Sequence, residues 1–144
     1  MANHKLLGLV ATATLLSSAH MVDHAIRDEL PRWPAEDLAT FAVVNLVLFG
    51  ALGTGIYLYV RGKVGPRFWT LFSFTGVLLG WASHFSPFTD QPVSYILGAY
   101  DYGVGGWLAV AVLLALMLVM TIAGVYAASL WRREVRMQRR MEGA

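Results

Sequence analysis

Cysteine is absent from this chain of 144 residues. This absence excludes disulfides, thiolate-ligated zinc, iron–sulfur clusters and thiol–disulfide exchange. Charged residues are also scarce, at 14% of the chain, whereas soluble domains carry about a quarter. The sequence lacks a basic face with interleaved aromatic residues, so nucleic acid is not an expected partner. The composition is that of a membrane protein, and any redox chemistry in it needs a cofactor.

Long apolar runs occupy most of the chain. A bilayer core about 30 Å thick requires roughly 20 predominantly apolar residues in a helix. Four stretches meet this requirement: residues 5–26, 38–60, 66–84 and 105–131, the last followed by a basic tail at 132–144. The sequence therefore predicts an all-α fold over residues 1–144, in which one transmembrane domain forms an integral membrane four-helix bundle.

The charges are segregated between the two sides of this four-helix topology. Nine of the eleven basic residues fall on one side: Lys5, Arg61, Lys63, Arg67, Arg132, Arg133, Arg136, Arg139 and Arg140. Seven of the nine acidic residues fall on the other: Asp23, Asp28, Glu29, Glu36, Asp37, Asp90 and Asp101. Because basic loops stay in the cytoplasm, we expect a multi-pass protein of the inner or plasma membrane. Both termini and a short hairpin are then cytoplasmic, and two loops are extracytoplasmic.

The N-terminal residues permit a second interpretation. Residues 1–19 also resemble a secretory signal, with Lys5, an apolar run at 6–16 and small residues at 17–19. Cleavage there would leave three spans and a new amino-terminal His20, which could chelate copper. The apolar character resumes weakly beyond this point, which favours an uncleaved first helix.

Histidines provide the main candidate for chemistry. His20, Asp23 and His24 are spaced by three and four residues, so they share one helix face near the end of the first span. His84 ends the third span, and odd-numbered spans finish on the same side of the membrane. Neutral imidazole is the commonest transition-metal ligand. The sequence therefore predicts that His20, Asp23, His24 and His84 can form a site for zinc, iron or copper.

Haem b is an alternative occupant of the same region. Two imidazoles from facing helices, His20 and His84, can ligate haem iron axially. Gly76 and Gly80 lead up to His84 at four-residue intervals, which leaves room for a flat macrocycle. A simpler interpretation is favoured, in which the glycines let helices approach closely and the histidines lie in the headgroup zone. Asp23, Asp28 and Glu29 would then form a solvated salt-bridge loop with Arg27 and Arg32.

Three classes of function remain. The favoured one is an accessory or structural subunit of a membrane complex, whose partners are the lipid bilayer and other membrane subunits or a second copy. The second is a protein that holds haem or a metal between the first and third helices for redox chemistry. A carrier of small solutes is the third, and it is least favoured because no charged residue lies in the middle of a span.

Overall fold

A computed structural model describes residues 2–27, 34–89 and 91–142, apart from the side chain of Asp37. Of these residues 85% are helical and none forms a strand, which confirms the predicted all-α fold. Their helices, in chain order, are α1 (His4–Arg27), α2 (Ala35–Val60), α3 (Pro66–His84), α4 (Val93–Gly98) and α5 (Val104–Glu142). Four charges that entered the sequence argument lie outside the described residues: Asp28, Glu29, Arg32 and Asp90.

The turn between α2 and α3 follows from local sequence. Gly62 adopts φ +67°, a conformation that glycine tolerates without steric cost. The amides of Gly62 and Lys63 donate to the carbonyls of Tyr59 and Leu58 at 3.0 and 2.8 Å, which is the Schellman pattern that ends a helix. Pro66 then occupies the first turn of α3, where its missing amide costs no hydrogen bond. The result is a tight hairpin.

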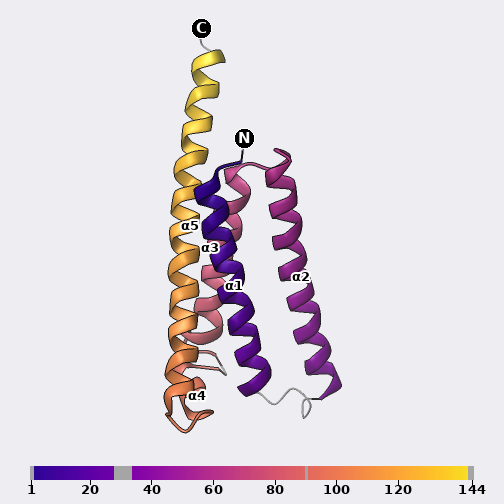
Figure 1. The fold of residues 1–144 in the computed structure, drawn as a ribbon, viewed down its shortest axis with the longest axis vertical. Helices are drawn as coiled ribbons and strands as arrows, with labels where there is room; N and C mark the ends of the chain where they lie inside the picture. Colours follow the sequence, from indigo (N-terminus) through magenta and orange to yellow (C-terminus); the bar gives the residue numbers. More distant parts are fainter. Residues whose placement is uncertain (1, 28–33, 90, 143–144) are drawn as a thin grey trace.

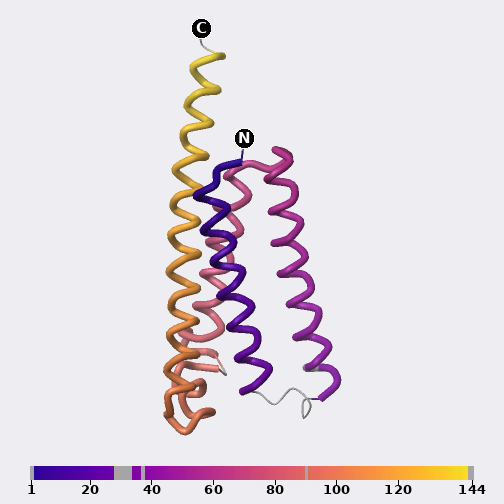
Figure 2. The backbone as a smooth tube through the Cα atoms, viewed as in Figure 1, coloured from indigo at the N-terminus to yellow at the C-terminus, as the bar shows by residue number. Residues whose placement is uncertain are grey.

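α5 is the helix against which the others pack. It contacts both α1 and α3 along much of their length, and Figures 1 and 2 show it as one continuous helix beside them. One core cluster lies where these helices meet the end of α2. It consists of Leu6, Val10, Tyr59, Trp69 and Ala127. The side chains of Leu6, Trp69 and Ala127 are at most 1% exposed.

α2 stands apart from the other helices. Its contacts with them are sparse, and Figure 1 shows it set to one side of α1, α3 and α5. Near its beginning the Phe41 ring lies 6.1 Å from the His24 ring, and near its end the Tyr59 hydroxyl accepts a hydrogen bond from the Asn3 amide at 3.2 Å. Gly55 lies directly against the Phe68 ring. α2 is therefore anchored at one end and loosely packed toward its beginning.

Both ends of the chain lie at one end of the bundle, as Figure 1 shows. α1 and α3 finish at the opposite end, which we call the histidine end because His24 and His84 are there. α4 covers this end by packing Ile96 against Ala109, Val110 and Leu113 of α5. The sequence predicts only an extracytoplasmic loop between the last two spans, so α4 is an element that it did not indicate.

The helix bounds agree with the sequence in part. α3 has the predicted limits, α2 begins three residues earlier than expected, and α5 continues through most of the basic tail. Three segments of the described chain are long and apolar enough to cross a membrane: His4–Arg27, Leu38–Val60 and Val104–Glu142. α3 has 19 residues, but Pro66, Arg67 and several small polar residues dilute its apolar character. The protein thus has the helices of a membrane protein, and the fourth span stays a prediction.

The position of Leu6 and Val10 bears on whether residues 1–19 are removed as a secretory signal. Because both side chains lie in the core cluster, loss of residues 1–19 would remove part of the contact surface that fixes α1, α3 and α5. We therefore expect the intact mass of the detergent-extracted protein to include these residues. An Ala19→Leu variant, which removes a small residue from the apparent cleavage position, should be equally abundant and equally long. A mass that lacks the first 19 residues would contradict this expectation.

Candidate functional site

Three imidazoles converge at the histidine end. His20 and His24 lie one turn apart on α1, and His84 is the last residue of α3. Ring centroids are separated by 4.7 Å for His20 and His24, 5.1 Å for His20 and His84, and 5.7 Å for His24 and His84. His84 is buried and the other two are half-buried. Helix parity and four-residue spacing together correctly predicted that these residues lie at one end.

The three rings form a group that fits a metal ion. Each ring contributes one nitrogen to a set of three, and these three nitrogens all lie within 4.8 Å of one another. Imidazole nitrogens bind zinc or copper at about 2.0–2.1 Å, which places two ligands of a tetrahedral site about 3.4 Å apart. The rings are therefore close to a binding geometry, and modest side-chain rotations would bring their nitrogens onto one ion.

A backbone hydrogen bond orients His84. Its Nδ1 lies 3.0 Å from the carbonyl oxygen of Gln91, and a carbonyl oxygen can only accept. Nδ1 therefore carries the proton, which leaves the lone pair on Nε2. Metal-binding histidines commonly donate the N–H of their second ring nitrogen to a carbonyl in this way, and the bond fixes both the tautomer and the direction of the ring. His84 is thus prepared to bind through Nε2.

His20 offers a second prepared nitrogen. Its Nδ1 is buried and has no hydrogen-bond partner among the described residues. Leaving such a polar atom unsatisfied typically costs about 1–3 kcal/mol. A bound ion would remove this cost, because the nitrogen would then form a coordination bond.

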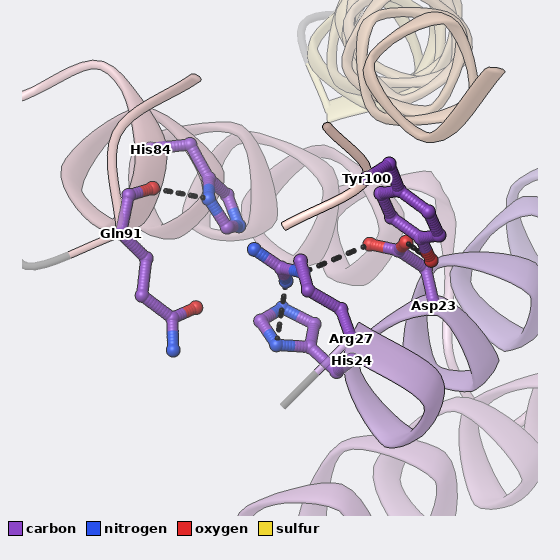
Figure 3. A network of polar contacts seen from close by, with 6 residues as sticks. All are labelled: Asp23, His24, Arg27, His84, Gln91 and Tyr100. Carbon is purple, nitrogen blue, oxygen red and sulfur yellow. Dashed lines mark hydrogen bonds and ion pairs between the residues drawn. The ribbon is translucent and has the colours of Figure 1, made fainter. Parts of the chain in front are cut away.

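Asp23 lies beside the three imidazoles, but its carboxylate has other partners. Oδ1 accepts a hydrogen bond from the Tyr100 hydroxyl at 2.8 Å, and Oδ2 lies 3.5 Å from Nε of Arg27. Figure 3 shows the carboxylate turned toward these two side chains. The structure therefore brings together His20, His24 and His84, while Asp23 as a direct metal ligand stays a prediction.

The sequence interpretation of Arg27 is wrong. It predicts that Arg27 and Asp23 belong to a solvated salt-bridge loop, yet both residues are only 8% exposed. The Arg27 Nη2 atom lies 3.0 Å from Nδ1 of His24, and its guanidinium lies 5.5 Å from the centre of the Tyr95 ring. The four-residue spacing of Asp23 and Arg27 was a signal for an ion pair on one helix face. Nothing in the sequence indicated the partners Tyr95 and Tyr100.

Tyr100 reaches Asp23 because of a left-handed turn. Asp101 and Tyr102 have φ values of +49° and +58°, and the amide of Tyr102 donates to the carbonyl of Leu97 at 2.9 Å. This hydrogen bond and the two left-handed residues end α4 and reverse the chain before α5 begins. Aspartate tolerates the left-handed region better than most residues. The turn thereby holds the Tyr100 ring against the end of α1.

An apolar cavity of about 650 Å³ adjoins the imidazoles. Side chains of α1, α2, α3 and α5 line it, among them Val10 and Trp69 as well as His20, His24 and His84. Because Val10 and Trp69 lie toward the other end of their helices, the cavity runs along the bundle and has the histidines at one end. Pockets of about 300–1,000 Å³ with apolar walls and a few polar groups are typical of small-molecule sites.

Gly76 and Gly80 face α5, and methionine side chains occupy the space beside both. A Cβ on Gly76 would collide with Met120, and one on Gly80 would lie 3.7 Å from Cγ of Met117. A haem packed directly against these two glycines would have to displace both methionines, whereas a single ion requires only rotation of the imidazoles. Gly76 and Gly80 as haem contacts stay a prediction.

No protein-family model matches the chain, and neither does any curated protein or solved structure.

Proposed function

We propose that the protein binds one transition-metal ion through His20, His24 and His84. The convergence of three imidazoles from two helices carries this proposal. An accessory subunit requires only surfaces that pack, and it gives no reason for three histidines to share one place with a prepared nitrogen on His84. The metal interpretation, which was second on sequence alone, is therefore preferred. The lipid bilayer and the other partners named from the sequence stay predictions.

The ligand set selects the class of ion. Three neutral imidazoles without a thiolate suit Zn²⁺ or Cu²⁺, and Cu²⁺ has the highest affinity for nitrogen ligands among the divalent first-row ions. Three protein ligands also leave one position of a tetrahedral site open, as in catalytic zinc sites. Such an ion can polarise an oxygen ligand or lower the pKa of a bound water.

The apolar cavity indicates what the open position serves. Val43, Val44 and Val47 of α2 line the cavity, yet they are 58%, 59% and 65% exposed. In a bilayer this loosely packed side of the cavity would face lipid chains. We infer that a lipophilic molecule with an oxygen donor enters there and presents the oxygen to the metal. Its acyl or alkyl part would lie among the apolar side chains.

We also propose that α3 crosses the membrane as the third of four spans, with both termini cytoplasmic. The charge segregation supports this orientation. The position of both chain ends at one end of the bundle in Figure 1 supports an even number of spans. The histidine end would then be extracytoplasmic, in the inner or plasma membrane.

Metal content tests the central proposal. We expect about one Zn²⁺ or Cu²⁺ per chain in protein purified without chelators, measured by elemental analysis. Substitution of His20, His24 or His84 by Ala should lower the affinity by more than the 10- to 100-fold that is typical of losing an outer-shell partner. His4→Ala is the matched control, because His4 lies at the other end of α1. Equal affinity in all four variants would remove the three histidines as ligands.

Orientation can be tested with single cysteines, because the native chain has none. We expect a membrane-impermeant maleimide to label Glu36→Cys and Ser94→Cys from outside intact cells. Lys63→Cys and Met141→Cys should react only after lysis. Because α3 separates residue 63 from residue 94, labelling of both from the same side would contradict a spanning α3.

The cavity is tested by a bulky substitution with an adjacent control. Val47 lines the cavity, whereas its neighbour Leu46 does not. In Co²⁺-loaded protein, we expect a long-chain carboxylate to change the visible spectrum of the ion. Val47→Trp should suppress this change without altering metal content, and Leu46→Trp should preserve it. An unchanged response in Val47→Trp would show that the ligand does not use the cavity.

A further inference from the structure

We propose that Arg27 is an internal cation that competes with the metal for His24, and that Asp23 accepts Arg27 when the metal binds. The inference rests on the proposed metal site and deepens it, since it names the residues that set its affinity. It also gives Asp23 a role other than that of ligand.

The first step is the hydrogen bond between Arg27 and His24. A guanidinium can only donate, so Nδ1 of His24 accepts through its lone pair at 3.0 Å. His24 in this arrangement carries its proton on Nε2. The lone pair of Nδ1 is then engaged by Arg27, and Nε2 is protonated, so neither ring nitrogen of His24 is available to a metal.

The second step is that this bond and metal binding exclude each other whichever nitrogen is used. If the metal binds Nδ1, the ion takes the lone pair that Arg27 now holds. If the metal binds Nε2, that nitrogen must lose its proton, and a neutral ring then carries the proton on Nδ1. A protonated Nδ1 cannot accept from Arg27. Arg27 must therefore leave His24 in both cases, and repulsion between the two cations acts in the same direction.

The third step is a place for Arg27 to go. Asp23 Oδ2 already lies 3.5 Å from Nε of Arg27, one helical turn away, and this oxygen accepts no hydrogen bond among the described residues. A small rotation of the Arg27 side chain would turn this loose pair into a hydrogen-bonded one. Tyr100 holds the other carboxylate oxygen at 2.8 Å, so Asp23 stays in position while Arg27 moves. Asp23 is thus a positioning residue.

Arg27 also connects the metal site to α4. Its guanidinium lies over the Tyr95 ring, and Tyr95 belongs to the short helix that covers the histidine end. Figure 3 shows Arg27 between Asp23 on one side and His24 on the other. Movement of Arg27 toward Asp23 would therefore alter the contact with Tyr95.

The test is the affinity of the purified full-length protein for Zn²⁺, titrated against a chelator. Arg27→Met should bind Zn²⁺ more tightly by on the order of tenfold, because a hydrogen bond from a charged group no longer opposes binding. Damage to the fold would lower the affinity instead. Arg27→Lys retains a charge and a donor and should stay near the native value. Arg61→Met removes a cation at the other end of the bundle and should change nothing.

A double-substitution cycle separates the two possible roles of Asp23. Asp23→Asn should weaken Zn²⁺ binding in the native background, since Arg27 loses its alternative partner. In the Arg27→Met background the same substitution should have a much smaller effect. An equal loss in both backgrounds would make Asp23 a ligand and overturn its proposed role.

The outcomes distinguish this inference from the metal proposal. Unchanged or weaker binding by Arg27→Met, in protein of native size, overturns the competition while leaving the metal site intact. If the native chain binds no Zn²⁺ but Arg27→Met does, the competition is supported and the native chain is not a zinc protein. If neither binds, both proposals fail.

Discussion

The packing of α5 against both α1 and α3 is the contact on which the candidate site depends. Helices in a bilayer gain little from burying apolar surface, so close van der Waals contact fixes their relative position. The buried face of α5 provides that contact through small and branched side chains such as Ala109, Leu113, Ala123 and Ala127. Because α1 and α3 run along the same helix, their last turns come side by side. His84 thereby meets His20 and His24, although it follows them by 64 and 60 positions in the sequence.

Periodicity and topology predicted the elements of this site but not its polar contacts. Spacings of three and four residues are enough to place His20, Asp23 and His24 on one face, and counting spans is enough to place His84 at the same end. The partners of Asp23 depend on where Tyr100 lies, and that depends on a left-handed turn at Asp101 and Tyr102. Such a turn at two non-glycine residues leaves no clear pattern in the sequence.

Two differences from the sequence interpretation have simple physical causes. The basic tail is helical as far as Glu142 because arginine, methionine, glutamine and glutamate are good helix formers, and solvation of their charges does not oppose a helix. Gly76 and Gly80 create space on α3, as the sequence indicated. Spacing alone cannot say what fills this space, and flexible methionines from α5 occupy it because such side chains readily fill irregular gaps.

The charges at the histidine end constrain what the proposed metal would bind. Asp23 and Arg27 are both buried, and as an ion pair they contribute no net charge. Three neutral imidazoles add none. Counted over these described groups alone, a divalent ion would leave two positive charges next to an apolar cavity, where uncompensated charge is costly. An anionic oxygen ligand in the open position would offset part of this charge, and neutral water would not. The burial of Arg27 also bears on the proposed pairing of Asp23 with Arg27. As a ligand, Asp23 would reduce the charge of the metal, but it would leave a buried guanidinium without its carboxylate.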